Sequence, residues 1–399
     1  MKDYTKSNRL DNKITGLICD NWNKICIFAL LVLSVYLRML PGDALSGDAT
    51  AKLIPWYEEI KSTGGFWGLD HEVGDYNMFY QFILAILTYI PLKPIYAIKL
   101  SSCVFDYLLA GAVSAIVFEL TNKNKVNAYI SLFIVLFSPL VWINSAWWAQ
   151  CDAMYVSLCL WAIYFYIKEK YLACFVIYGF SFAFKLQGIF ILPLFLFLYV
   201  YHKRYTILNY LAIPIMMMIS AIPCVIAGRG KKSIIRVMTF YIFEAGIWKK
   251  MYLNYPSFWC LLRGENSEEF FEILKSPAIA FTVIILAVFM TYWFNKKIEV
   301  NAKNIVFMAF LLSYTCVLFL PAMHERYGFL FEILGIAIAF INKKTIIPLI
   351  AMNAMILALY GNYLILGVSA TNLYALAWVN LLIYLFYVYI LNKDMVNKK

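Results

Sequence analysis

The chain has 399 residues, of which 63% are hydrophobic and only 14% are charged, and its formal net charge is +11. Soluble domains are nearer to half apolar and a quarter charged, so the composition excludes an ordinary soluble fold and indicates a protein whose solvent is largely lipid. The positive charge is typical of a positive-inside bias and of contact with anionic lipids. Because no clustered basic face with interleaved aromatic residues is visible, nothing indicates nucleic-acid binding.

Apolar runs predict an all-α, polytopic membrane bundle with about twelve transmembrane helices. The predicted spans cover residues 22–40, 96–120, 126–143, 148–167, 171–184, 187–201, 206–227, 278–294, 305–320, 327–341, 345–363 and 372–391. Several are shorter than the roughly 20 residues of a full crossing, so we expect some helices to be broken, tilted or buried in the bundle. The short apolar run at 76–91 is interpreted as a juxtamembrane or re-entrant segment.

Basic residues set the predicted orientation. If the N-terminus is cytoplasmic, the segments on its side carry Lys2, Lys6, Arg9, Lys13, Lys123, Lys125, Lys168, Lys170, Lys203, Arg204, Lys296, Lys297, Lys303, Lys343, Lys344, Lys393, Lys398 and Lys399. The short loops at 144–148 and 364–371, on the other side, carry no basic residue. The positive-inside rule therefore predicts that both termini are cytoplasmic. The many Lys and Asn residues favour a bacterial plasma membrane.

Two large loops lie on the predicted external side. The first, at 41–95, is acidic, and the second, at 228–277, is basic and aromatic. The expected organisation is therefore a cytoplasmic segment (1–21), a helical module that includes the first loop (22–227), the second loop (228–277) and a C-terminal membrane module (278–399).

Polar side chains at membrane depth are candidate site residues, because polar groups are costly in lipid. Asp48 follows Ser46 and Gly47 just past the first span, where a partly shielded carboxylate can act as a general base. The alternative for Asp48 is an ordinary solvated loop residue. Gln150 and Asp152 follow a tryptophan pair that is typical of a membrane interface, and Asp152 could instead cap a helix.

Lys185 lies in an apolar stretch between Cys174 and Tyr201. If this stretch forms two half-length helices, Lys185 lies at the external turn. If it forms one long helix, Lys185 is buried at membrane depth and needs a partner. In both cases the ammonium group can bind phosphate or form an ion pair with Asp152.

His324, Glu325 and Arg326 are three consecutive ionisable residues at the external end of an apolar span. Arginine binds phosphate through paired hydrogen bonds, and histidine can donate a hydrogen bond or a proton. The segment therefore predicts a phosphate-binding turn, with an interfacial charged turn as the alternative. The sequence has no P-loop, GxGxxG or HExxH motif, so nothing indicates an ATPase, a Rossmann domain or a zinc protease.

Together these segments resemble the GT-C class of polytopic glycosyltransferases. The resemblance is greatest to bacterial relatives of the GPI-anchor second mannosyltransferase and more distant to dolichyl-phosphate-glucose glucosyltransferases. The matching stretches, in family order, are Ser46-Gly47-Asp48, Pro55-Trp56-Tyr57, Gly64-Gly65, Asp75-Tyr76-Asn77, Gln150-Cys151-Asp152, Phe184-Lys185-Leu186-Gln187, Asn254-Tyr255-Pro256-Ser257-Phe258-Trp259 and Met323-His324-Glu325-Arg326-Tyr327. Where the family usually has Pro-Pro after Tyr-Asn, this chain has Met78-Phe79.

The resemblance implies a GT-C-like helical module followed by variable C-terminal spans. It also implies that Asp48 is the catalytic base. The residues expected to bind the donor phosphate are His324, Arg326 and Lys185. Those expected to line the cavity or contact the acceptor are Gln150, Asp152, Tyr76, Asn77, Glu325 and Trp259.

The residues alone favour a compatible reaction. Nucleotide sugars and ATP are absent outside the cell, so the donor must arrive activated and membrane-borne, as a polyprenyl-phosphate sugar does. We expect an inverting displacement onto a glycan or glycolipid acceptor, with mannose favoured by the resemblance. No metal is obligatory because protein cations can neutralise phosphate, although the acidic first loop could hold a divalent cation.

Two other functions stay open. A flippase or transporter of lipid-linked sugars would use the same basic cavity without a positioned base. A glycan ligase or polymerase that uses a diphosphate carrier would need a basic external loop, which 228–277 provides.

Overall fold

The computed structural model describes residues 7–244, 247–262, 266–366 and 372–396. Lys2, Lys6, Lys398 and Lys399, which contribute to the predicted orientation, and most of the predicted loop at 364–371 lie outside these ranges. Every regular element in the described residues is helical, so the all-α prediction is confirmed. The chain divides into two units, residues 1–42 and residues 43–399.

The first unit consists mainly of α1 (Ser7–Met39), which begins earlier than the span predicted at 22–40. Its apolar side chains are exposed along the helix, for example Phe28 at 67% and Leu33 at 51%. The part from Asp11 to Met39 is long and apolar enough to cross a membrane. Lipid is the solvent that such a surface requires.

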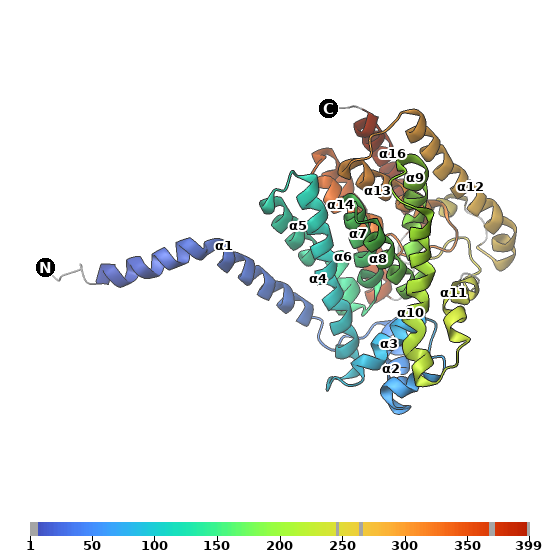
Figure 1. Cartoon of the computed structure of the whole chain (residues 1–399), viewed down its shortest axis with the longest axis horizontal. Helices are drawn as coiled ribbons and strands as arrows, with labels where there is room; N and C mark the ends of the chain where they lie inside the picture. The colour runs from blue at the N-terminus through green and yellow to red at the C-terminus, as the bar shows by residue number, and fades with distance from the viewer. Residues whose placement is uncertain (1–6, 245–246, 263–265, 367–371, 397–399) are drawn as a thin grey trace. The chain divides into compact units, whose positions relative to one another are not determined.

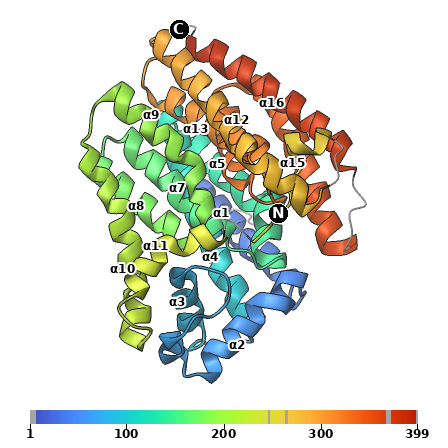
Figure 2. The same ribbon diagram turned by 90° about the vertical axis from the view of Figure 1, so that its right-hand side faces the viewer.

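The second unit is a helical bundle (Figures 1 and 2). Its α-helices are α2 (Ile54–Ser62), α3 (Met78–Leu87), α4 (Pro94–Leu120), α5 (Lys125–Phe137), α6 (Pro139–Trp142), α7 (Asp152–Ile167), α8 (Tyr171–Phe184), α9 (Leu192–His202), α10 (Ala212–Ala227), α11 (Ser233–Glu244), α12 (Glu268–Asn295), α13 (Ala302–Phe319), α14 (Phe329–Ala339), α15 (Ile346–Gly361) and α16 (Leu373–Val396). In sequence order along the bundle, α4 packs on α5 and α7, α7 on α8, and α8 on α10.

The number of candidate spans is smaller than predicted. In the described residues seven helices are long and apolar enough to cross a membrane, and an eighth crossing results if 125–137 and 139–147, which are bent by 46° at Pro139, count as one. The prediction of about twelve spans was therefore wrong. The helices α7, α8 and α14 have only 16, 14 and 11 residues, and most of their side chains are buried by protein. Burial in protein and burial in lipid both select apolar residues, so hydropathy alone does not separate them.

The predicted second loop also contains more helix than expected. Residues 228–277 include α11 and the beginning of α12. Ser267 caps α12 by accepting a hydrogen bond from the backbone N–H of Phe270, and two acidic residues follow in the first turn. Such a start favours a helix before the apolar run itself begins. The run at 76–91 contains α3, whose ten residues are too few for a full crossing.

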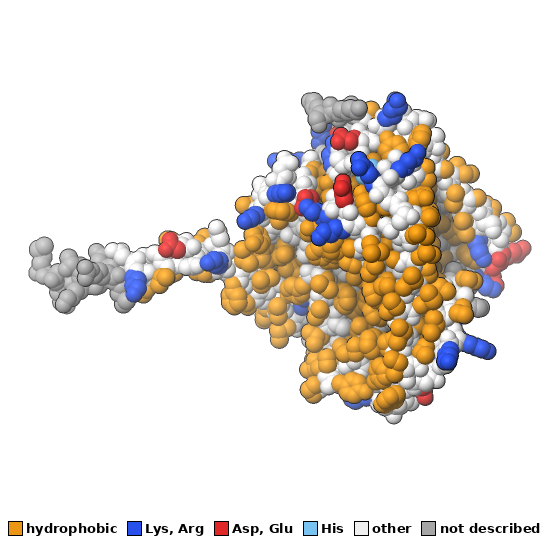
Figure 3. Space-filling model, viewed as in Figure 1, with side chains coloured by type: hydrophobic (Ala, Val, Ile, Leu, Met, Phe, Trp, Pro, Cys, Tyr) orange, Lys and Arg blue, Asp and Glu red, His pale blue; other side chains and the backbone are white. Residues whose placement is uncertain are grey.

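Basic residues gather at one end of the bundle. The turns that carry Lys123, Lys168, Lys170, Lys343 and Lys344 connect α4 to α5, α7 to α8 and α14 to α15. Figure 3 shows blue side chains concentrated at the upper end of the second unit, above a broad hydrophobic surface. The opposite helix ends, where α7 and α14 begin and α8 and α13 end, hold the polar residues described next.

Candidate functional site

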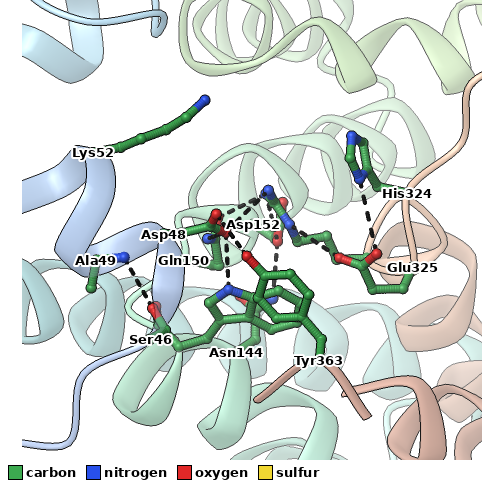
Figure 4. Close-up of polar contacts among 12 residues, drawn as sticks. Ser46, Asp48, Ala49, Lys52, Asn144, Gln150, Asp152, His324, Glu325 and Tyr363 are labelled. Atoms are coloured by element: carbon green, nitrogen blue, oxygen red, sulfur yellow. Dashed lines mark hydrogen bonds and ion pairs between the residues drawn. The ribbon is translucent and has the colours of Figure 1, made fainter. Parts of the chain in front are cut away.

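The loop before α2 is tied to the bundle by Ser46. Its hydroxyl donates to the backbone carbonyl of Trp148 at 2.9 Å and accepts from the backbone N–H of Ala49 at 3.1 Å. The second bond spans three residues at the beginning of the helical turn that starts at residue 47 and continues through Ala49–Leu53. Ser46 therefore fixes the position of the neighbouring Asp48 (Figure 4).

Three hydrogen bonds from distant segments hold the Asp48 carboxylate. Trp148 Nε1 and Gln150 Nε2 donate to Oδ2 at 3.0 and 2.7 Å, and the Tyr363 hydroxyl donates to Oδ1 at 2.9 Å. A carboxylate has about four acceptor positions, so Oδ1 can still accept from a hydroxyl group in front of it. The side chain is 24% exposed, which leaves it shielded but reachable.

A strained turn lets both Trp148 and Gln150 reach the same oxygen. Ala149, between them, has φ +64°, in the left-handed region. For a residue with a Cβ this conformation costs on the order of 1–3 kcal/mol and persists only where the surroundings impose it. The backbone N–H of Gln150 donates to the Asn144 carbonyl at 2.9 Å, which helps to hold the turn.

Asp152 and Lys185 form an ion pair behind this turn. Lys185 Nζ lies 2.5 Å from Asp152 Oδ1, and the two side chains are 9% and 1% exposed. Asn144 Nδ2 donates to the other oxygen of Asp152 at 2.9 Å. Lys185 follows the last residue of α8 in extended backbone, so the apolar stretch is two half-length helices and Lys185 lies at the turn.

Arg326 connects the two carboxylates. Its Nη1 donates to Gln150 Oε1 at 2.7 Å and lies 3.9 Å from Asp152 Oδ2, while Nη2 lies 3.6 Å from Asp48 Oδ2. The guanidinium carbon also lies 5.6 Å from the ring centre of Trp148. Gln150 bonds to Asp48 with its amide nitrogen and to Arg326 with its oxygen, so it sets the spacing between the carboxylate and the guanidinium group.

His324 and Glu325, which precede Arg326 in the chain, have pKa values that burial shifts in opposite directions. Burial, together with the charges of Arg326 and Lys185, lowers the pKa of His324 to about 3. The imidazole is therefore neutral at physiological pH and can act as a hydrogen-bond donor. Burial also raises the pKa of Glu325, whose side chain is 2% exposed. Trp248 packs edge-on against His324, with the ring centres 5.1 Å apart.

Part of this cluster lines a cavity of about 610 Å³, whereas Asp152, which was predicted to line it, is not among the lining residues and lies behind Lys185 and Arg326. The polar wall of the cavity includes Asp48, Gln150, Lys185, His324 and Arg326, which were all predicted from the sequence. Its apolar wall comes from Leu186, Ile189, Phe190, Phe271, Ile279 and Leu320. A polar cluster at one side and an apolar surface at the other suit an amphiphilic ligand.

The remaining predicted residues occupy different positions. Tyr76 lines the cavity, and its hydroxyl lies 3.4 Å from Gln150 Oε1. Asn77 also lines the cavity, but its side chain caps α3 and donates to the Val237 carbonyl. Trp259 is not among the lining residues; it donates to the Phe319 carbonyl at 2.7 Å and packs in a hydrophobic cluster.

Several site residues were missed from the sequence. Trp148 was read as an interfacial residue, whereas its indole N–H holds Asp48. Tyr363 and Asn144 were not identified, although both lie at helix ends on the predicted external side, which was the available signal. Lys52 and Asp75, which form a 2.5 Å ion pair at the cavity wall, were also missed.

In the part of the chain that the structure describes, no group of three or more His, Cys, Asp or Glu side chains is arranged to hold a metal ion. No protein-family model matches the chain, and no curated protein sequence matches it. The candidate spans show a polytopic helical membrane protein. The comparisons identify no family, so the resemblance to the GT-C class stays a prediction.

Proposed function

We propose that this protein is a glycosyltransferase of the GT-C class that transfers a sugar from a polyprenyl-phosphate donor. The observation that carries the proposal is the pairing of Asp48 with Arg326 at the polar end of the cavity. Asp48 keeps an acceptor position free, and a guanidinium group lies 3.6 Å from its other oxygen. General-base catalysis and anion stabilisation need such groups side by side.

The proposed reaction is a single displacement. The acceptor hydroxyl gives its proton to Asp48 while its oxygen forms a bond to the anomeric carbon. The bond from that carbon to the phosphate oxygen breaks, and polyprenyl phosphate leaves with the electron pair. Attack from the face opposite the leaving group inverts the anomeric centre.

Proton transfer also changes the partner of Arg326. Asp48, Asp152, Lys185 and Arg326 carry two formal negative and two formal positive charges, and Glu325, whose pKa burial raises, lies 3.8 Å from Arg326 Nε. As Asp48 takes up the proton it loses its charge, so Arg326 becomes available to the departing phosphate. Neutral His324 would donate a hydrogen bond to the same group.

The apolar wall supports a lipid-linked donor. Phe271, Lys275 and Ile279 belong to α12, a candidate membrane span, and all three line the cavity. A carrier lipid lying against α12 would bring its phosphate past Lys275 toward Arg326. We further propose that the sugar is mannose and that the acceptor is a glycan or glycolipid. The reaction would take place at the outer face of a bacterial plasma membrane.

The test is a donor panel. The protein is reconstituted in lipid nanodiscs with polyprenyl-phosphate mannose, glucose and galactose, with the corresponding diphosphate-linked sugars, and with cell-envelope glycolipids as acceptors. We expect release of polyprenyl phosphate from one monophosphate donor. Turnover of diphosphate donors alone would favour a ligase or polymerase, and lipid translocation in vesicles without any release would favour a flippase.

A further inference from the structure

One face of a single helical segment continues the site outward from Asp48. Asp48, which directly precedes Ala49–Leu53, Lys52 within that turn and Trp56 in α2 are spaced four residues apart, and all three line the cavity. Side chains at this spacing lie on one face of a helix. Eight α-helical residues would place Trp56 roughly 12 Å along the axis from Asp48, and the wider turn at Ala49–Leu53, which is π-helical, makes the separation somewhat shorter. That separation is longer than one hexose ring.

Trp56 is held as a fixed platform. Gly74, with φ +70°, packs directly against its indole, and a Cβ at position 74 would overlap the ring. Tyr76 packs against Trp56 with ring centres 5.4 Å apart. The indole is nevertheless only partly buried and lines the cavity. Sugars stack their C–H faces on aromatic rings presented in this way.

Polar groups suited to sugar hydroxyls lie between Trp56 and Asp48. Lys52 Nζ is 2.5 Å from Asp75 Oδ2, and both side chains are partly exposed, at 44% and 33%. Asp75 Oδ1 is buried yet accepts no hydrogen bond from any described residue. In Figure 4, Lys52 extends beside the Asp48 cluster without contacting the residues drawn.

We infer that Lys52, Trp56 and Asp75 form a subsite for the second sugar unit of the acceptor. The inference rests on the proposed glycosyl transfer. The acceptor's terminal sugar would present its hydroxyl to Asp48, and the next sugar would stack on Trp56. That second sugar would donate a hydroxyl to the exposed side of the Asp75 carboxylate and accept from Lys52, the two partly exposed members of the ion pair. Because the Lys52–Asp75 pair is neutral overall, the subsite suits an uncharged sugar better than a phosphate group.

Such a subsite would make the protein bind a disaccharide acceptor more tightly than a monosaccharide. Binding of methyl mannoside, methyl glucoside and methyl galactoside, and of the corresponding methyl disaccharides, is measured by calorimetry on the full chain in nanodiscs. We expect at least one disaccharide to bind about tenfold more tightly than its monosaccharide, the size of one good stacking contact plus a hydrogen bond. Trp56→Ala and Asp75→Asn should each remove most of this difference.

Two further variants separate recognition from folding. Trp56→Phe keeps an aromatic face and should restore part of the preference for the disaccharide. Trp67→Ala removes a tryptophan that is 61% exposed and is not among the cavity-lining residues, so the preference should persist. The inference is overturned if wild type binds no disaccharide more tightly than its monosaccharide, or if Trp56→Ala and Asp75→Asn both keep the preference.

Release of polyprenyl phosphate is followed in the same preparations. Release by wild type, combined with an unchanged length preference in both variants, would leave the proposed function standing and remove the subsite. A length preference that both variants abolish, with no release from any donor, would leave the sugar subsite standing and remove the transferase.

Discussion

At the residue scale, the Asp48 carboxylate depends on groups that come from three separate parts of the chain. Trp148, Gln150 and Tyr363 donate to it, and Arg326 lies within ion-pair distance. None of these donors is close to Asp48 in sequence. The residue type and the loop position of Asp48 could be predicted, but its partners depend on how helices pack and could not.

The charge state of His324 is a first testable consequence. Because burial lowers its pKa to about 3, its ring should stay neutral from pH 8 down to about pH 4. His71 should behave in the opposite way, since a hydrogen bond to Asp70 raises its pKa. Nitrogen-15 NMR of histidine-labelled protein measures both, with His324→Gln and His71→Gln to assign the signals. A His324 ring that gains its proton near pH 6.5 would contradict the described environment.

Arg326→Lys tests the role of the guanidinium group. A lysine ammonium cannot reach Gln150, Asp48 and Asp152 together, so stabilisation of the leaving phosphate should fall. We expect kcat/KM for the donor to decrease by about 10²–10³-fold, as for loss of one oxyanion donor. The acceptor KM should change much less. The control is Arg236→Lys, because Arg236 forms a partly exposed ion pair with Glu72 and does not line the cavity. If Arg326→Lys left kcat/KM for the donor unchanged, Arg326 would have no role in binding the phosphate.

At the scale of elements, the break between α8 and α9 places the Lys185 ammonium against Asp152. The chain leaves the helix at Lys185 and re-enters one through Leu186–Ile191. Both alternatives drawn from the sequence included an ion pair with Asp152. The sequence alone could not choose between one helix and two, because long apolar runs lie on both sides of Lys185, Gln187 and Gly188 and a single helix can also carry such residues.

Lys185→Met should destabilise the fold. Removing one partner of a buried ion pair costs on the order of 3–5 kcal/mol, because the other charge stays buried. Thermal unfolding of purified protein should therefore show a clearly lower Tm. The double variant Lys185→Met/Asp152→Asn should recover part of the loss. Equal Tm values for wild type and Lys185→Met would show that the pair contributes nothing to stability.

Helix lengths explain where prediction of the spans failed. Hydropathy located the apolar segments that became α7, α8 and α14, and their short lengths predicted that some helices would be broken or buried, but it did not show which ones protein covers. Pro139 bends another predicted span by 46°. The number of membrane spans could not be predicted from composition, because a helix buried in a protein core and a helix in lipid both need apolar side chains.

At the scale of the whole molecule, basic turns and the polar cavity occupy opposite ends of the second unit. This arrangement agrees with the sequence-based expectation that the site faces outward, although the side of each loop is still a prediction. The cavity could be anticipated because its polar residues lie in segments that all fall on one predicted side. Its apolar wall, and the contribution of α12 to that wall, depend on packing alone.

Accessibility of single cysteines tests this orientation. The nine native cysteines are replaced, and one cysteine is introduced as Ser62→Cys, at the end of α2, or as Lys170→Cys, in the turn between α7 and α8. A membrane-impermeant maleimide added to intact cells should label the first variant. The second should react only after the membrane is opened. The reverse pattern would place the site in the cytoplasm and make a nucleotide-sugar donor available to it.

The central claim is that Asp48 is the base of a transfer from a polyprenyl-phosphate sugar. The most direct test is release of polyprenyl phosphate by nanodisc-embedded wild type and Asp48→Asn, with Glu58→Gln, an exposed acidic residue of α2, as the matched control. We expect release by wild type and the control, and a loss of about 10²–10⁴-fold in Asp48→Asn, with unchanged Tm. Wild-type rates in Asp48→Asn would contradict the claim.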